Sequence, residues 1–219
     1  MKKIGFAFLV AFILVLVCCG GTLKILAYTS DLIDIASGKG NAVYITATII
    51  IESLKNEADI EFLKKNLNSF SNEQIVKYNY SDSLSFDIKI PILNIANVSA
   101  HNLEKDLLYL IAEEEDNYYS FSYKFNSSLM NTIDSYVYNT YFQHIDFSNF
   151  ETSIIIENDT RSVSKLTAFS VYINNQPFPF NVTRELQRRD RVELKISEVL
   201  RSAISKNNNI RYPIFRISK

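Results

Sequence analysis

The sequence predicts an α+β fold, with about three to four short helices and a mostly antiparallel sheet in a single domain after an N-terminal hydrophobic segment. Hydrophobic residues make up 47% of the chain, which is enough for a buried core. No linker rich in Pro, Gly or Ser divides the chain after that segment. Several stretches alternate apolar and polar residues as strands do, and others repeat apolar residues with the helical period.

Four segments favour helices because apolar residues recur three and four positions apart or because a capping residue precedes them. Ser30 with Asp31, Ser53 and Ser197 are expected to begin three of these helices. The expected helices cover residues 30–35, 53–70, 127–142 and 197–206.

Strands are expected where β-branched and aromatic residues alternate with polar ones. The run 43–52 is apolar on both faces, which is typical of a central strand, whereas Pro91 places the strand 86–92 near an edge. Segments 107–113 and 119–125 flank an acidic turn and predict a hairpin. The remaining expected strands cover residues 153–157, 164–173, 192–196 and 212–217.

Asparagine pairs mark two of the predicted connections. Asn158-Asp159 and Asn174-Asn175 predict turns, because Asn tolerates left-handed dihedral angles. The tract 176–180 contains two prolines and is expected to connect two strands and to pack Phe178 or Phe180 into the core.

The N-terminal segment is typical of an exported protein. Met1-Lys2-Lys3 is basic, and the fourteen residues 4–17 are apolar. That length is short for a membrane span, which needs about 20 helical residues. The segment ends at Cys18 and Cys19, the only cysteines of the chain. The following domain therefore offers no disulfide, cysteine metal site or catalytic cysteine.

The paired cysteines predict a bacterial lipoprotein signal peptide over residues 1–19, with Cys19 acylated and residues 20–219 exported. Aligned on Cys19, Leu16 takes the usual Leu position, although Cys18 stands where a small residue is usual. Cys18 is the alternative lipid-bearing residue, but it would place Val17 at the cleavage bond. An uncleaved anchor over residues 4–23 and a simple cleaved signal peptide remain open.

All three interpretations export the domain, and the first two attach it to a membrane of a bacterial cell envelope. Lipoprotein maturation attaches more than one acyl chain, the condition for stable anchoring. Gly20 follows Cys19, where Asp often retains lipoproteins at the inner membrane. The outer membrane is therefore favoured where two membranes are present.

Charge is nearly balanced overall and unevenly distributed. The net charge of −1 gives no basic excess, which argues against a nucleic-acid partner. Residues 104–159 carry a net charge of −9, and residues 184–219 carry +6. Two interpretations are open: solvated or mutually paired segments, and a basic docking patch at Arg188, Arg189 and Arg191 for lipid headgroups or an acidic partner.

Three stretches together resemble a known group of sequences. Their common features are a leader that ends in Cys, a Thr-Ala-Thr strand, and a strand–turn–strand unit with a following Arg-rich run. The stretches are residues 23–36, 46–49 and 171–194. The chain resembles a family of uncharacterised lipoproteins of about this length, found in bacteria and in some bacteriophages or prophages. Asn174-Asn175 replaces the expected Asn-Gly. The resemblance implies a lipid anchor and a domain of unknown function, with no assigned catalytic residue.

No catalytic, cofactor or metal motif is present. The two histidines, His101 and His144, stand apart in the sequence, and no Zn²⁺, phosphate-loop, dinucleotide or nucleophile-elbow pattern occurs. The acidic run 113–116 lacks Ca²⁺-loop spacing and is expected to be a solvated hairpin tip. We expect a non-catalytic protein that binds an envelope component, for example an envelope protein. The alternatives are a hydrolase of cell-wall sugars and a structural subunit of an envelope assembly.

Overall fold

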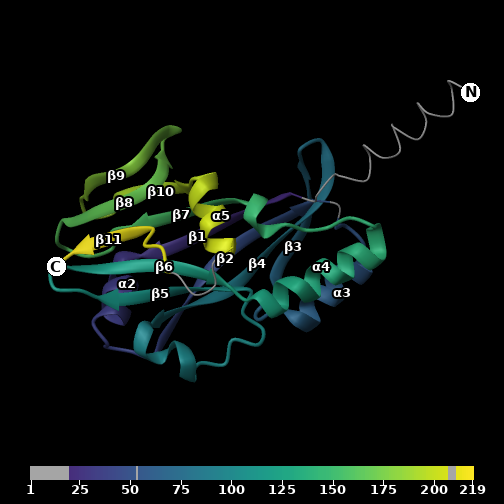
Figure 1. Cartoon of the computed structure of the whole chain (residues 1–219), viewed down its shortest axis with the longest axis horizontal. Helices are drawn as coiled ribbons and strands as arrows, with labels where there is room; N and C mark the ends of the chain where they lie inside the picture. Colours follow the sequence, from purple (N-terminus) through teal and green to yellow (C-terminus); the bar gives the residue numbers. More distant parts are fainter. Residues whose placement is uncertain (1–19, 53, 207–210) are drawn as a thin grey trace, which may run out of the picture.

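A computed structural model of the chain describes residues 20–52, 54–206 and 211–219 (Figure 1). The strands of this part are β1 (Gly21–Tyr28), β2 (Ala42–Glu52), β3 (Ser71–Tyr78), β4 (Ser81–Asn94), β5 (Leu108–Glu114), β6 (Tyr118–Phe125), β7 (Glu151–Glu157), β8 (Ser164–Ile173), β9 (Gln176–Leu186), β10 (Arg191–Ile196) and β11 (Phe215–Ser218). The helices are α2 (Thr29–Ala36), α3 (Glu57–Asn66), α4 (Ser127–Tyr141) and α5 (Glu198–Lys206), with short 3-10 turns η1 (Ile95–Ala100) and η2 (Phe147–Asn149).

The described strands form one mixed sheet in the order β10-β7-β1-β2-β4-β5-β6-β11-β8-β9, and β3 joins it beside β4. β10 pairs with both β7 and β8, so the sheet closes on itself. The β1–β7 and β4–β5 pairs are parallel, and the other described pairs are antiparallel. The α+β class is confirmed, whereas the mixed, closed sheet goes beyond the sequence-based expectation.

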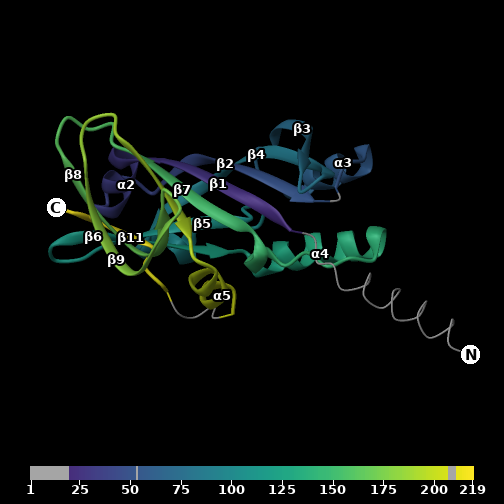
Figure 2. The same cartoon turned by 90° about the horizontal axis from the view of Figure 1, so that it is seen from above.

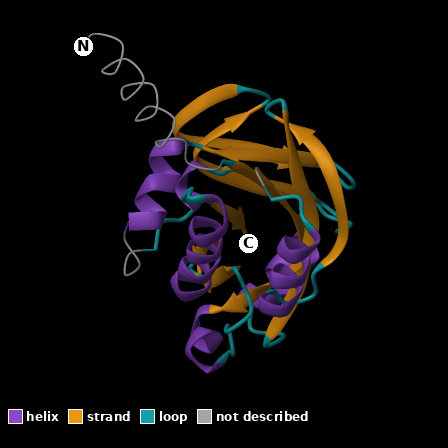
Figure 3. Cartoon of the chain, turned by 90° about the vertical axis from the view of Figure 1, so that its right-hand side faces the viewer, coloured by secondary structure: helices purple, strands orange, loops and turns teal. Residues whose placement is uncertain are grey.

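Buried apolar side chains form one continuous cluster lined by alternate residues of the strands. On β1, Leu23, Ile25 and Ala27 are buried while Lys24 between them is exposed. Each fully buried Leu or Ile side chain stabilises the fold by roughly 1.5–3 kcal/mol. Figure 2 places the β8–β9 hairpin at one end of the molecule and α3 and α4 at the other, and Figure 3 shows the strands curving round beside the helices.

All four expected helices are present, but the first two begin differently from the expectation. Ser30 does not cap α2, because its hydroxyl and amide both donate to the Asp159 carboxylate of the β7–β8 loop. Helix α3 is capped by Asn56, and the expected cap Ser53 lies outside the described residues.

The two later helices match the expectation more closely. Asn126 caps α4, where its side-chain oxygen accepts the amides of Ser128 and Leu129. The hydroxyl of Ser197 accepts the Leu200 amide at 3.3 Å and caps α5 as expected.

A buried carboxylate joins α3 to α4. Asp59 is fully buried, and its Oδ1 accepts the Tyr136 hydroxyl at 2.9 Å. Its Oδ2 accepts the Tyr141 hydroxyl at 2.7 Å and the amides of Lys55 and Asn56 at 2.9 and 2.8 Å. The same side chain thus completes the N-terminal capping box of α3 and ties it to α4.

The strand of Pro91 was expected near an edge, and β4 is an interior strand that lies next to the edge strand β3. β4 is flanked by β2 on one side and by β3 and then β5 on the other. Pairing with β3 ends at Asp87 and pairing with β5 begins at Ile92. Pro91 falls in the gap between them, where a residue without an amide N–H is accommodated.

The tract 176–180 is also not a simple connector, because it begins strand β9. Among the described strands β9 pairs only with β8, and an edge strand of this kind tolerates Pro177 and Pro179. Phe178 packs against the core as expected, whereas Phe180 is 84% exposed.

Candidate functional site

The predicted lipid-bearing residues Cys18 and Cys19 lie outside the described residues, but Gly20 already belongs to the fold. Its amide donates to Glu52 Oε2 at 2.9 Å, and its carbonyl accepts the Glu52 amide at 3.1 Å. At Gly21 a Cβ atom would lie 2.3 Å from the Ile50 carbonyl oxygen, so only glycine fits this approach. Gly20, the residue that follows Cys19, is therefore part of the folded domain.

The predicted basic patch is divided by the structure. Arg188 and Arg189 are exposed on the β9–β10 turn, where Arg189 adopts a left-handed φ of 70°. Arg191 instead lies 2.6 Å from Glu157 Oε2 on the neighbouring strand β7. Asp190 accepts the Gln187 amide at 2.8 Å and shapes the turn. Arg191 thus differs from the other two in having an ion-pair partner within the domain, although its side chain is still 64% exposed.

Part of the charge asymmetry is resolved by pairing within the domain. Five cations of the basic C-terminal segment contact acids of the segment 104–159. The pairs are Arg191–Glu157, Lys195–Glu151, Arg211–Glu113, Lys219–Glu114 and Arg216–Glu115. The acidic hairpin tip is therefore covered by cations rather than only solvated, which favours the mutually paired interpretation.

A groove of about 490 Å³ lies on the outer faces of β1, β7 and β10 and beneath the tip of the β8–β9 hairpin. We call it the outer groove, and its polar lining is Thr22, Lys24, Glu151, Thr152, Ser153, Tyr172, Asn174, Asn175, Glu193 and Lys195. The predicted turn at Asn174-Asn175 is confirmed, since both residues adopt left-handed φ angles of 49° and 62°.

The outer groove offers mixed polar chemistry without net charge. Lys24 Nζ lies 3.5 Å from Glu193 Oε1, and Lys195 Nζ lies 2.9 Å from Glu151 Oε2. Tyr172 adds an aromatic ring that is 37% exposed. Ammonium donors, carboxylate acceptors, side-chain amides and a ring face together suit a neutral polar ligand.

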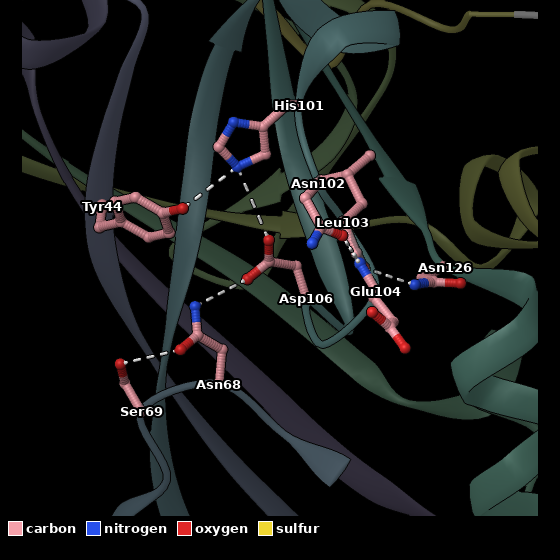
Figure 4. Close-up of polar contacts among 9 residues, drawn as sticks. All are labelled: Tyr44, Asn68, Ser69, His101, Asn102, Leu103, Glu104, Asp106 and Asn126. Carbon is pink, nitrogen blue, oxygen red and sulfur yellow. Dashed lines mark hydrogen bonds and ion pairs between the residues drawn. The ribbon is translucent and has the colours of Figure 1, made fainter.

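A second polar cluster surrounds Asp106 (Figure 4). We call Tyr44, Asn68, His101 and Asp106 the Asp106 cluster. The Tyr44 hydroxyl lies 3.1 Å from His101 Nε2, which lies 3.8 Å from Asp106 Oδ2. Asn68 Nδ2 donates to Asp106 Oδ1 at 3.3 Å. These contacts join β2, the α3–β3 loop and the loop before β5.

The Asp106 side chain is only 3% exposed, and its two polar contacts, with Asn68 at 3.3 Å and with His101 at 3.8 Å, are long. Burial raises the pKa of Asp106, and the contacts with Asn68 and His101 oppose that rise. Burial and then the nearby Asp106 charge also raise the pKa of Tyr44. The cluster can hold or release a proton, and the hydroxyl group that contacts His101 belongs to Tyr44.

Sequence reasoning set aside both histidines and did not identify Tyr44 or Asp106. No local pattern could have found them, because Tyr44 is 57 residues from its partner His101. His144 contacts Asp134 at 3.0 Å and stacks on Tyr138 at the surface. Among the described residues, no group of three His, Cys, Asp or Glu side chains could hold a metal ion.

None of the helices in the described part of the chain combines the length and apolar character that crossing a membrane requires.

Comparison with known proteins identifies a matching family and assigns no activity to the chain. A family model described as a domain of unknown function (DUF7424) matches residues 22–218. The searches of curated proteins and of solved structures both found no match.

Proposed function

We propose that this chain, which belongs to the DUF7424 family, is an exported lipoprotein of the bacterial cell envelope that binds another envelope component without catalysing a reaction. The observation that carries the proposal is the position of Gly20. It follows the candidate lipidated residue Cys19 and is bonded through both its amide and its carbonyl to Glu52. An acyl anchor on Cys19 would hold the domain directly against the membrane surface.

The outer groove is the proposed binding site. Its two lysines and two glutamates cancel in charge, and Tyr172 and the Asn174-Asn175 turn border it. A neutral polar surface of an envelope partner would complement such a lining better than a strongly charged one. The exposed arginines Arg188 and Arg189 on the β9–β10 turn offer a separate, weaker contact for an acidic surface.

Hydrolysis of cell-wall sugars is less well supported by the same groove. A glycosidase needs two carboxyl groups free to act as acid and as base or nucleophile. Glu151 and Glu193 each contact a lysine, at 2.9 and 3.5 Å. Assembly through the edge strand β9 is also less well supported, because Pro177 and Pro179 interrupt its amide N–H pattern.

Mass spectrometry of the mature N-terminus tests the anchor. The full chain expressed in a bacterial host should yield a first residue Cys19 that carries acyl chains. Cys19→Ser should abolish lipid labelling and release the domain from the membrane fraction, whereas Cys18→Ser should leave both unchanged. Unaltered labelling of Cys19→Ser would show that the anchor has been assigned to the wrong residue.

Site-specific photo-crosslinking tests the binding site. A photoreactive amino acid replaces Tyr172 in the full chain within intact envelopes, and Val163, which is 52% exposed in the β7–β8 loop, is the control position. A discrete adduct at the Tyr172 position and none at the Val163 position is the expected result. Equal adducts at both positions would remove the groove from the proposal.

A further inference from the structure

The β3–β4 hairpin ends in a tip with an unusual residue. Asn79 and Tyr80 form its two-residue turn, with left-handed φ angles of 46° and 65°. Asn-Gly is the favoured pair in such a turn, since glycine adopts the left-handed region without a steric cost. Here the glycine position is occupied by Tyr80, whose side chain is fully exposed at 104%. No contact within the described domain accounts for this tyrosine.

One carboxylate connects this tip to the start of the domain. Glu52 Oε1 accepts the Asn79 side-chain amide at 2.7 Å, and Glu52 Oε2 accepts the Gly20 amide at 2.9 Å. Figure 1 shows the tip of the β3–β4 hairpin standing beside the start of β1. Asn79, the residue before Tyr80, and Gly20, the residue after Cys19, therefore both donate to the Glu52 carboxylate.

Charge around the tip is compensated. Lys77 Nζ lies 2.7 Å from Asp82 Oδ1 across the hairpin, and Glu52 accepts two hydrogen bonds while the exposed Lys55 lies nearby in sequence. The four charges cancel, so no electrostatic attraction to anionic lipid is built into this end. Tyrosine itself is enriched where proteins meet the membrane–water interface, because its ring is apolar and its hydroxyl is polar.

We propose that Tyr80 inserts into the headgroup region of the membrane that carries the lipid anchor and forms a second attachment point. The inference rests on the proposed acylation of Cys19. A peptide unit spans less than 4 Å, so an acylated Cys19 brings Gly20, Glu52 and the hairpin tip to the membrane surface together. Two attachment points fix the orientation of the domain, which a single attachment point cannot do.

The chain contains no tryptophan, so a single Tyr80→Trp substitution creates a specific reporter. The lipid-modified full chain is reconstituted into phosphatidylcholine vesicles with or without lipids that carry a fluorescence quencher at headgroup depth. Phe180→Trp is the matched control, because Phe180 is 84% exposed on β9, at the other end of the molecule from α3 and α4 in Figure 2. We expect a shorter emission wavelength and loss of fluorescence to the quencher for Tyr80→Trp, and neither change for Phe180→Trp.

The outcomes separate this inference from the anchor. If the chain floats with the vesicles but Tyr80→Trp is no more quenched than Phe180→Trp, the second attachment is wrong and the anchor stands. If the N-terminus carries no acyl chain and the protein does not float, the proposed function and this inference both fail. Tyr80→Gly should fold as well as the original chain and lose only the fixed orientation, measured as greater mobility of a spin label at Arg188→Cys in a chain whose Cys18 is replaced by Ser.

Discussion

Two buried carboxylates, Asp59 and Asp106, show how differently one residue type is used in this fold. Asp59 is fully buried and receives four hydrogen bonds, two of them from tyrosines of another helix. Asp106 is 3% exposed, yet it has one amide donor at 3.3 Å and a histidine nitrogen at 3.8 Å.

The difference lies in the number and quality of donors, not in burial. A buried carboxylate is stabilised when its lone pairs are satisfied, and each donor to a charged acceptor contributes about 1.5–3 kcal/mol. Asp59 therefore holds α3 and α4 together. The pKa of Asp106 is raised because burial outweighs its two weak partners. This residue is more dispensable to folding, and its protonation is open to change.

The largest effect is expected for Asp59→Asn. The amide NH₂ group of Asn meets hydrogen-bond donors where Asp59 presents acceptor oxygens, so the free energy of unfolding should fall by about 3 kcal/mol. Chemical denaturation measures the loss. Asp116→Asn on the exposed β5–β6 tip is the control and should change stability by less than about 0.5 kcal/mol. Equal losses for both variants would refute the structural role of Asp59.

The next effect concerns the two tyrosine donors. Tyr136→Phe and Tyr141→Phe should each lower the free energy of unfolding by about 1.5 kcal/mol, and the double variant should deviate from additivity because both bind one carboxylate. Additive losses would mean that the two hydrogen bonds act independently of Asp59.

Alkaline pH gives a further measurement on the same junction. Burial, with the Asp59 hydrogen bond, raises the pKa of Tyr136 to about 12 from the ordinary 10.0. The folded state then binds a proton that the unfolded chain has lost, so stability falls as pH rises from about 10 towards 12. Tyr136→Phe should show a weaker decline across this range. An identical decline would place the alkaline transition elsewhere.

Asp106→Asn is expected to change stability much less than Asp59→Asn does. Asn retains an acceptor for Asn68 and removes a poorly partnered charge, so stability at neutral pH should change by less than about 1 kcal/mol. The raised pKa of Asp106 means that the folded state favours the proton, and this residue costs stability as pH rises above about 4. Denaturation at about pH 4 and about pH 6.5 should show that the variant loses this dependence. A loss as large as that of Asp59→Asn would make the two carboxylates equivalent.

The smallest effect is expected for an exposed ion pair. Lys219 Nζ lies 2.8 Å from Glu114 Oε1, and their side chains are 33% and 49% exposed. Solvent and salt screen such a pair, so Glu114→Gln should cost less than about 0.5 kcal/mol. Thermal denaturation at low and high salt measures it, and a larger loss would show that the charge pairing between the two segments carries real stability.

Sequence periodicity predicted the elements whose burial alternates along their own length. Helix α4 and strand β10 follow this rule, and the Asn174-Asn175 turn follows from the backbone preference of asparagine. Two of the strands that it missed break the rule, because β3 is polar and largely exposed and β9 contains two prolines. β1 does alternate in burial, but its sequence follows the hydrophobic leader and has one exposed charge.

The candidate sites were less predictable than the elements. Asp59 was not distinguished from other acids of α3, because its tyrosine donors lie 77 and 82 residues away. The outer groove combines residues of β1, β7, β8 and β10, and this combination depends on the parallel β1–β7 pair and on the closure between β10 and β8. The predicted arginine cluster was divided because Arg191 on β10 forms an ion pair with Glu157 on the neighbouring strand β7.

By itself, the sequence determined the α+β class, the positions of most helices and strands, the near-neutral charge and the cysteine pair that suggests a lipid anchor. These properties depend on residues a few positions apart, since dihedral preference and the alternation of burial are local. Only the tertiary structure decided which acids are buried, which cations they meet, and that Tyr80 lies beside the start of the domain. Those properties depend on contacts between segments far apart in the chain, which local periodicity does not encode.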